Sequence, residues 1–346
     1  MKYLIGPITA VAVAATGASA ETSAKGPDPV NDCMSQDENG MSQDEGGSSE
    51  MSAVKMGPII EDPCPQAAGE VAAGAGAATS RAIASAIGSA ISARSGSGSS
   101  AARNKLFFSN QGPGDRGDAE FSIWASLEGR AFSGDLGGDG VDLTFGADFE
   151  VAANAFLGLL LSYADYDVTS GGVNFDSEGL TFGPYFTTQV GESGQFDAYL
   201  VYGEPDYDGA GVSYSSERTI GGVAYSQDLT LGNMDVTAFA TLDGFTEELS
   251  AAAPGGARTV RSTTLSLGAQ LNFQPVNRIS PYVSLAAEGN RFDDGLGNNS
   301  TSFAPRLGVG FSAETNRGRL SVDIDAGEVF DGARDVGANV SYVLNF

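Results

Sequence analysis

The last twelve residues of the sequence read Asp335-Val-Gly-Ala-Asn-Val-Ser-Tyr-Val-Leu-Asn-Phe346. Every second residue from Val336 to Phe346 is apolar, and the residues between them are small or polar, with Val343 as the exception. Successive side chains of a β-strand point to opposite faces of the sheet. The stretch therefore predicts a strand with one apolar face and one polar face.

The same alternation begins at Ala119 and continues to Phe346. It is sharpest from Val141 to Val151, where apolar residues alternate with a polar set that includes Asp142, Asp148 and Glu150. Charged groups at successive inward positions would be very costly in a dry core. A polar lumen would accommodate them, so the pattern predicts a β-barrel with its apolar face outward.

Twelve antiparallel strands are expected from this pattern. Their predicted ranges are Ala119–Ala131, Val141–Val151, Ala155–Val168, Asp176–Gln189, Gln195–Tyr207, Tyr214–Leu229, Met234–Glu247, Arg258–Phe273, Arg278–Phe292, Ser302–Glu314, Gly318–Val329 and Asp335–Phe346.

The predicted connections alternate in length, as in outer-membrane barrels. Short ones are expected near Ala153, Gly191, Gly232, Pro275 and Asn316, and longer ones at Ser133–Gly140, Thr169–Phe175, Leu249–Ala257 and Asp293–Thr301. Pro184 lies inside a predicted strand although proline cannot donate to the ladder, so we expect a local bulge there.

Composition excludes several functional classes. The net charge of −26 argues against nucleic acid as a partner, because phosphate binding needs clustered Lys and Arg. The sequence contains no histidine, which excludes Ser-His-Asp hydrolysis and His-ligated metal sites. We therefore expect no enzyme activity, no cofactor and no metal site.

The N-terminal residues divide into two predicted segments. Residues 1–20 read as a secretory signal peptide, with Lys2, an apolar stretch and the small-residue site Ala18-Ser19-Ala20. Residues 21–66 carry ten acidic side chains against two lysines and show no apolar period, so we expect a disordered tail. Cys33 and Cys64 lie in this tail, and a disulfide between them is a hypothesis for an oxidising compartment.

Residues 67–103 are rich in Ala, Gly and Ser. Ile83, Ile87 and Ile91 recur every four residues and would form a narrow apolar stripe on a helix. A helix from Ala67 to Arg94 would be about 40 Å long, enough to cross a bilayer core of about 30 Å. Its small side chains would suit a narrow lumen, and the alternative is a flexible linker.

These features together resemble the C-terminal translocator domain of autotransporters. The residues that carry the resemblance are Trp124-Ala-Ser-Leu-Glu-Gly129 in the opening strand, the stretch from Tyr202-Gly203 to Asp208, and the closing Tyr342-Val-Leu-Asn-Phe346. The resemblance implies an all-β fold, a 12-stranded transmembrane barrel over residues 119–346 with the helix in its lumen. It also implies a location in the bacterial outer membrane, with lipid and the barrel-assembly machinery as partners of a monomer. Tyr342, Leu344 and Phe346 would form the C-terminal assembly signal.

A helix in the pore would require partners for Arg81 and Arg94. The inward carboxylates expected to supply them are Glu128, Asp142, Asp148, Glu150, Asp197, Glu288, Asp323 and Asp325, with Arg130 on the same face. The alternative is that these carboxylates face channel water.

Two functions stay open on this basis. The first is a translocator that displays residues 21–66, a segment much shorter than the exported part of most family members. The second is a plain channel or structural envelope protein whose acidic lumen favours cations.

Overall fold

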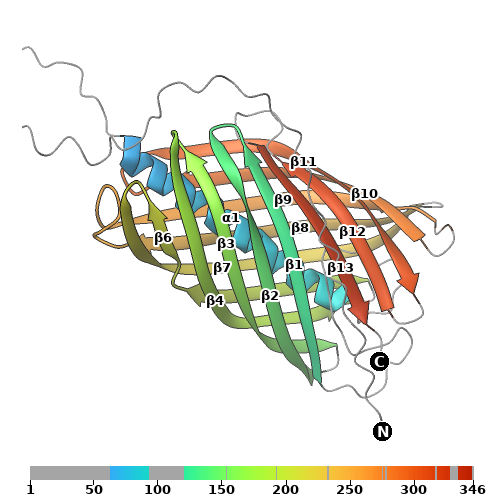
Figure 1. Cartoon of the computed structure of the whole chain (residues 1–346). Helices are drawn as coiled ribbons and strands as arrows, with labels where there is room; N and C mark the ends of the chain where they lie inside the picture. Colours follow the sequence, from blue (N-terminus) through green and yellow to red (C-terminus); the bar gives the residue numbers. More distant parts are fainter. Residues whose placement is uncertain are drawn as a thin grey trace, which may run out of the picture.

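The protein folds as a closed antiparallel barrel around one helix (Figure 1). The computed structural model describes residues 63–92, 121–152, 154–191, 193–231, 234–274, 276, 279–315, 318–327 and 334–344. Within them the helix α1 spans Pro63–Ser92, so it begins four residues before the expected start. The predicted signal peptide, nearly all of the acidic tail and Arg94 lie outside the described residues.

The strands confirm the predicted twelve-stranded barrel. We call each strand position in its wall a stave. They are β1 (Phe121–Ser133), β2 (Leu136–Ala152), β3 (Ala155–Ser170), β4 (Val173–Val190), β5 (Gly194–Gly203), β6 (Asp206–Gly209), β7 (Val212–Leu231), β8 (Met234–Leu249), β9 (Arg258–Asn272), β10 (Ile279–Asp293), β11 (Asn299–Thr315), β12 (Gly318–Gly327) and β13 (Arg334–Leu344). β5 and β6 together form one stave, because both pair with β4 and β7 and only Glu204 and Pro205 separate them. The barrel closes where β1 pairs with β13.

The two faces of the wall differ as the alternation predicts. Outward side chains are apolar and exposed, among them Phe145 (47%), Leu159 (67%) and Phe303 (72%). Inward side chains such as Trp124 and Asp148 are buried to 2% exposure or less. An exposed apolar belt around a closed sheet with a polar interior is the arrangement of a transmembrane barrel.

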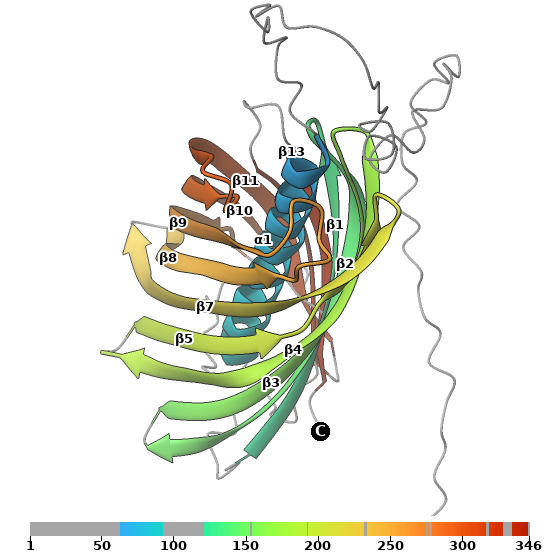
Figure 2. The same cartoon turned by 90° about the vertical axis from the view of Figure 1, so that its left-hand side faces the viewer.

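The two rims are distinguished by the course of the chain. The helix-entry rim, where α1 begins, carries the connections 134–135, 171–172, 210–211, 250–257, 294–298 and 328–333. The opposite rim carries 153–154, 191–193, 232–233, 273–278 and 316–317, and β1 starts there. Figure 2 shows α1 running inside the curved wall.

Two expected long connections are wrong. The strands continue through Ser133–Gly140 and Thr169–Phe175, leaving only the two-residue turns 134–135 and 171–172. Gly171 and Gly172 have φ of 58° and 83°, which glycine adopts without strain and which suits a two-residue hairpin. The glycines that suggested long loops therefore build tight turns and extended ribbons.

The expected bulge at Pro184 is also wrong. The β4–β5 register is the same on both sides of it, since Phe182 pairs with Tyr202 and Tyr185 with Tyr199. The ladder simply misses its pairing at this proline, which has no N–H to donate. The irregularity that does occur lies in β2, between Glu150 and Ala152.

Candidate functional site

The candidate site is the lumen, which α1 occupies with small side chains. The buried residues of α1 include Ala68, Val71, Ala75, Ile83 and Ile87. An alanine stripe lets a helix approach a wall closely, because it adds little volume beyond the backbone.

Two helical glycines mark the closest approaches of α1 to the wall. A Cβ built at Gly74 would lie 2.4 Å from Cδ2 of Leu136. A Cβ built at Gly76 would lie 2.8 Å from ring atoms of Phe245. The lumen therefore accepts the helix only because these positions carry no side chain.

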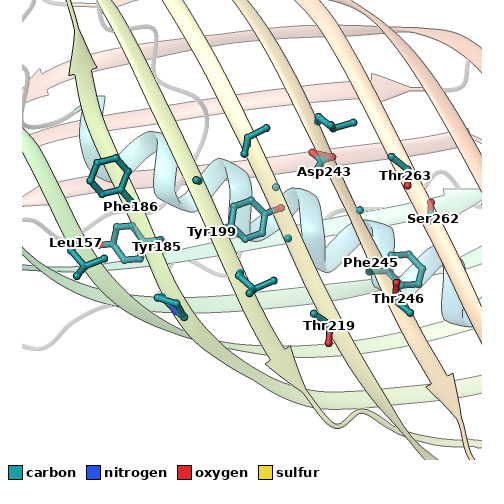
Figure 3. A pocket seen from close by; sticks show the side chains of 18 residues that line it. Leu157, Tyr185, Phe186, Tyr199, Thr219, Asp243, Phe245, Thr246, Ser262 and Thr263 are labelled. Carbon is teal, nitrogen blue, oxygen red and sulfur yellow. The ribbon is translucent and has the colours of Figure 1, made fainter.

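Polar contacts hold α1 at the helix-entry rim and in mid-lumen. Arg258 Nη2 donates to the backbone oxygen of Pro65 at 2.6 Å, and the Ser170 hydroxyl donates to Glu70. Deeper in, the Tyr199 hydroxyl donates to the backbone oxygen of Ser80 at 3.1 Å. Figure 3 shows Tyr199 in front of α1, beside a cavity of about 660 Å³ in the wall that Asp243 and Phe245 also line.

Arg81 joins α1 to a group of ion pairs that we call the luminal cluster. Its members are Arg81, Glu128, Arg130, Glu288, Arg306, Asp325 and Asp335. Arg81 Nη2 lies 3.8 Å from Glu288 Oε2, and Arg81 Nη1 donates to Asp335. The cluster thereby links the helix to the closing strand.

The other two arginines of the cluster come from the wall. Arg306 on β11 lies 2.9 Å from Glu288, 2.5 Å from Asp325 and 2.7 Å from Asp335. Arg130 on β1 lies 2.5 Å from Glu128 and 3.5 Å from Asp325, and it also donates to Asp335. Three arginines and four carboxylates thus neutralise most of their charge in the buried interior, which is the condition for keeping buried ions.

A cavity of about 190 Å³ lies beside the cluster and α1. Arg81, Arg130 and Arg306 line it together with Asp243 and Asp323, two further buried carboxylates of the lumen. The cavity leaves polar space in the lumen while the helix is in place.

The remaining predicted luminal residues lie elsewhere on the wall. Asp142 accepts a hydrogen bond from Tyr166, and Asp148 accepts one from Tyr185, whose hydroxyl accepts from Trp124 Nε1 at 2.7 Å. These carboxylates brace neighbouring strands of the wall.

Glu150, by contrast, is exposed at the opposite rim, where its carboxylate accepts from the Asn154 backbone N at 3.0 Å. Cys33, Arg94 and Phe346 lie outside the described residues. Cys64, Tyr342 and Leu344 are described by their backbone alone, in α1 and β13.

Sequence reasoning missed Asp335 and Arg306 as partners of the helix. The alternation does place both on the inner face, Asp335 with Gly337 and Arg306 with Gly308. What it cannot give is their depth in the barrel, which depends on how far neighbouring strands are shifted relative to one another.

A second buried network lies near the helix-entry rim. Arg218 Nε lies 2.8 Å from Glu247, which also accepts from Tyr207 at 2.6 Å and from Ser216 at 2.5 Å. The Tyr207 ring stacks on Tyr214 with centroids 4.9 Å apart. This network ties β6, β7 and β8 together where the stave β5–β6 is interrupted.

The described residues contain neither a membrane-spanning helix nor a cluster of metal-ligating side chains. No helix in that part of the chain is both long and apolar enough to cross a bilayer. Nor do three or more His, Cys, Asp or Glu side chains come together there in a way that could hold a metal ion.

Comparison with solved structures finds similar barrels. The β domain of the Bordetella autotransporter BrkA has 16% sequence identity and a TM-score of 0.49, covering 62% of this chain and 98% of its own. The translocator domain of NalP from Neisseria meningitidis has 12% identity and a TM-score of 0.48, covering 65% and 88%. The transport unit of AIDA-I from Escherichia coli has 12% identity and a TM-score of 0.46, covering 68% and 93%.

Sequence comparison assigns the family. No match was found among the curated proteins. The family model described as the autotransporter beta-domain matches residues 121–342, which covers all described strands except the last two residues of β13. The chain therefore belongs to the autotransporter β-domain family, whose barrels sit in the bacterial outer membrane.

Proposed function

We propose that this barrel is a translocator that displays its own N-terminal segment, residues 21–66, at the cell surface. The observation that carries the proposal is the course of the chain through the lumen. α1 begins at the helix-entry rim and runs inside the wall, and β1 starts at the opposite rim (Figure 1). In this proposal the helix-entry rim is the outer one, and residues 21–66 are exported through the barrel toward it.

The helix is proposed to remain in the barrel after export and to narrow the pore. Thirty helical residues span about 45 Å, more than the hydrocarbon core. The contacts of Pro65, Glu70, Ser80 and Arg81 with the wall favour one seated position.

Protease treatment of intact cells tests the display of the tail. An epitope placed between Glu21 and Glu61 should be removed by external protease, while the barrel fragment stays intact. Lysed cells serve as the control for total epitope. An epitope that is protected in intact cells and cut only after lysis would contradict the proposal.

A cation-favouring channel is the second candidate, because the cavity beside α1 has Asp243 and Asp323 in its wall. Conductance in planar bilayers separates the two functions. A translocator with a seated helix should conduct little as the full chain and several-fold more after deletion of residues 63–92. A channel should conduct equally with and without them.

We also propose that Tyr342, Leu344 and Phe346 present the C-terminal strand to the barrel-assembly machinery. Substitution of Phe346 by Ser should then lower the amount of folded barrel in the outer membrane. Unchanged levels in the membrane would rule out this role.

A further inference from the structure

The line of closure between β1 and β13, which we call the seam, is paired over only part of its length. The pairing runs from Glu128, opposite Asn339, to Ser133, opposite Arg334. This is the half of the seam nearer the helix-entry rim. Toward the opposite rim the two ribbons diverge (Figure 1).

In the part of the chain that the structure describes, the rest of each strand is paired with its other neighbour. Residues Phe121–Leu127 of β1 pair with β2, and residues Val340–Leu344 of β13 pair with β12. Within the described residues, these two segments do not pair with each other. Phe145 and Phe149, opposite this part of β1, belong to the exposed apolar belt, so this part of the seam lies at the depth of the lipid.

A short ladder between two strands holds them together less firmly than a long one, because fewer backbone hydrogen bonds join them at the depth of the hydrocarbon. The β1–β13 ladder has six residue pairs, whereas the neighbouring ladders have twelve between β1 and β2 and ten between β12 and β13. The seam is therefore the line along which the barrel wall is weakest.

Ion pairs cross the seam in its paired half. Arg130 on β1 donates to Asp335 on β13, and it lies 3.5 Å from Asp325 on β12. The backbone makes room for them at Gly337. A Cβ there would lie 2.7 Å from Asp325 Oδ2 and 3.1 Å from Arg130 Nη2.

The helix contributes to this crossing through one side chain. Arg81 donates to Asp335 and lies 3.8 Å from Glu288 on β10. Without its positive charge, the luminal cluster would hold two arginines against four carboxylates. The excess of negative charge would act on Asp335, whose ion pair with Arg130 crosses the seam.

We propose that the seam between β1 and β13 is where this barrel opens, and that α1 holds it closed through Arg81 and Asp335. The helix then stabilises the closed wall and also narrows the pore. This regulation rests on the proposed function for its biological meaning, although its measurement requires only the purified barrel.

Amide hydrogen exchange of the purified full chain, measured for individual peptides, tests whether α1 holds the seam closed. In Arg81→Gln, we expect amides of Glu128–Ser133 and Asp335–Asn339 to exchange about tenfold faster, while those of β3 and β4 are unchanged. Glu70→Ala is the control, because it removes a helix–wall hydrogen bond to Ser170 on β3, a strand that does not form the seam. It should leave the seam amides unchanged.

A double-mutant comparison distinguishes coupling from general loosening. Asp335→Asn should accelerate exchange at the seam as Arg81→Gln does, and the double variant should add little to Asp335→Asn alone. Should Arg81→Gln fail to assemble, Arg81→Lys keeps the charge, and its seam amides should exchange less than about threefold faster than those of the parent chain.

A disulfide across the seam supplies the reverse test. Gly129 and Ala338 are direct partners on the outer face. In a Cys33→Ser, Cys64→Ser background, G129C/A338C should return the exchange of Arg81→Gln to the parent value, whereas A147C/L159C between β2 and β3 should not.

The proposal is overturned if Arg81→Gln loosens all staves equally, if it leaves the seam unchanged, or if the seam disulfide fails to restore slow exchange. Failure of export has a different signature. It would appear as an epitope that external protease cannot reach, with the exchange pattern unaltered.

Discussion

Glu247 shows at the level of one residue how the lumen accommodates charge. Its side chain is fully buried and accepts from Tyr207, Ser216 and Arg218. A buried carboxylate is tolerated when a cation and hydrogen-bond donors surround it, and removal of one partner leaves an uncompensated charge.

Arg218→Gln is therefore expected to lower the free energy of unfolding by about 3–5 kcal/mol. Chemical unfolding of the purified barrel measures this loss. The double variant R218Q/E247Q should lose less, because no charge is then left buried alone. Arg261→Gln is the control on the exposed face of β9 and should change stability by less than about 0.5 kcal/mol. Equal losses for Arg218 and Arg261 would contradict this account.

The sequence predicted which face each side chain points to, but it did not predict which residues those side chains contact. Alternation alone placed Glu128, Arg130, Asp142 and Asp323 inside, and all four are buried. It gave no means of pairing Arg81 with Asp335, because the helix and β13 are more than 240 residues apart in sequence. Their meeting depends on the depth of α1 in the lumen and on the register of the closing strand.

At the level of elements, the fit of α1 depends on where its glycines lie. Gly69→Ala should raise the free energy of unfolding by up to about 1 kcal/mol, because alanine favours a helix and the new Cβ would meet Asp294 at an ordinary 3.5 Å. Gly76→Ala should lower it by about 1–3 kcal/mol, because its Cβ would meet the Phe245 ring at 2.8 Å. Thermal unfolding of both variants measures the difference. Equal stabilisation by both would show that α1 does not pack against Phe245.

The hairpin ribbons at the helix-entry rim carry a row of like charges. Asp139, Asp167, Asp176 and Asp208 face one another directly across β2, β3, β4 and β6, and all are exposed on the outer face. Like charges directly opposite in a sheet are destabilising.

Asp176→Asn should therefore stabilise the barrel by several tenths of a kcal/mol, because it removes two such pairs. Asp139→Asn, at the end of the row, should raise the free energy of unfolding by less, because it removes one such pair. Unfolding midpoints in low salt and in about 0.5 M salt measure both, and the gain should shrink in salt as screening increases. A loss of stability in low salt would show that the row is not under repulsion.

These ribbons also show why some elements escaped prediction. Glycine-rich stretches such as Gly137–Gly140 read as loops from composition, yet Gly138 and Gly140 lie inside β2 against the backbone of Asp167 and the ring of Tyr166. A large neighbour on the adjacent strand requires a glycine opposite it. That requirement appears only once the register is known.

For the whole molecule, the period-2 pattern determined the barrel, because only closure satisfies every strand edge in lipid. Closure in turn gives α1 an enclosed lumen, in which it begins at the helix-entry rim. Every functional proposal here depends on the outer face of this wall meeting lipid and the inner face meeting the helix and water.

Bilayer quenching along β10 tests that claim most directly. A fluorescent label would be attached to single cysteines at Val283, Ser284, Leu285, Ala286 and Ala287 in a background without Cys33 and Cys64. Val283 and Leu285 are exposed outward, whereas Ser284 and Ala286 line the luminal cavity. Brominated lipids should quench the labels at 283, 285 and 287 strongly and those at 284 and 286 weakly. Quenching without this alternation would contradict the membrane barrel and the functions derived from it.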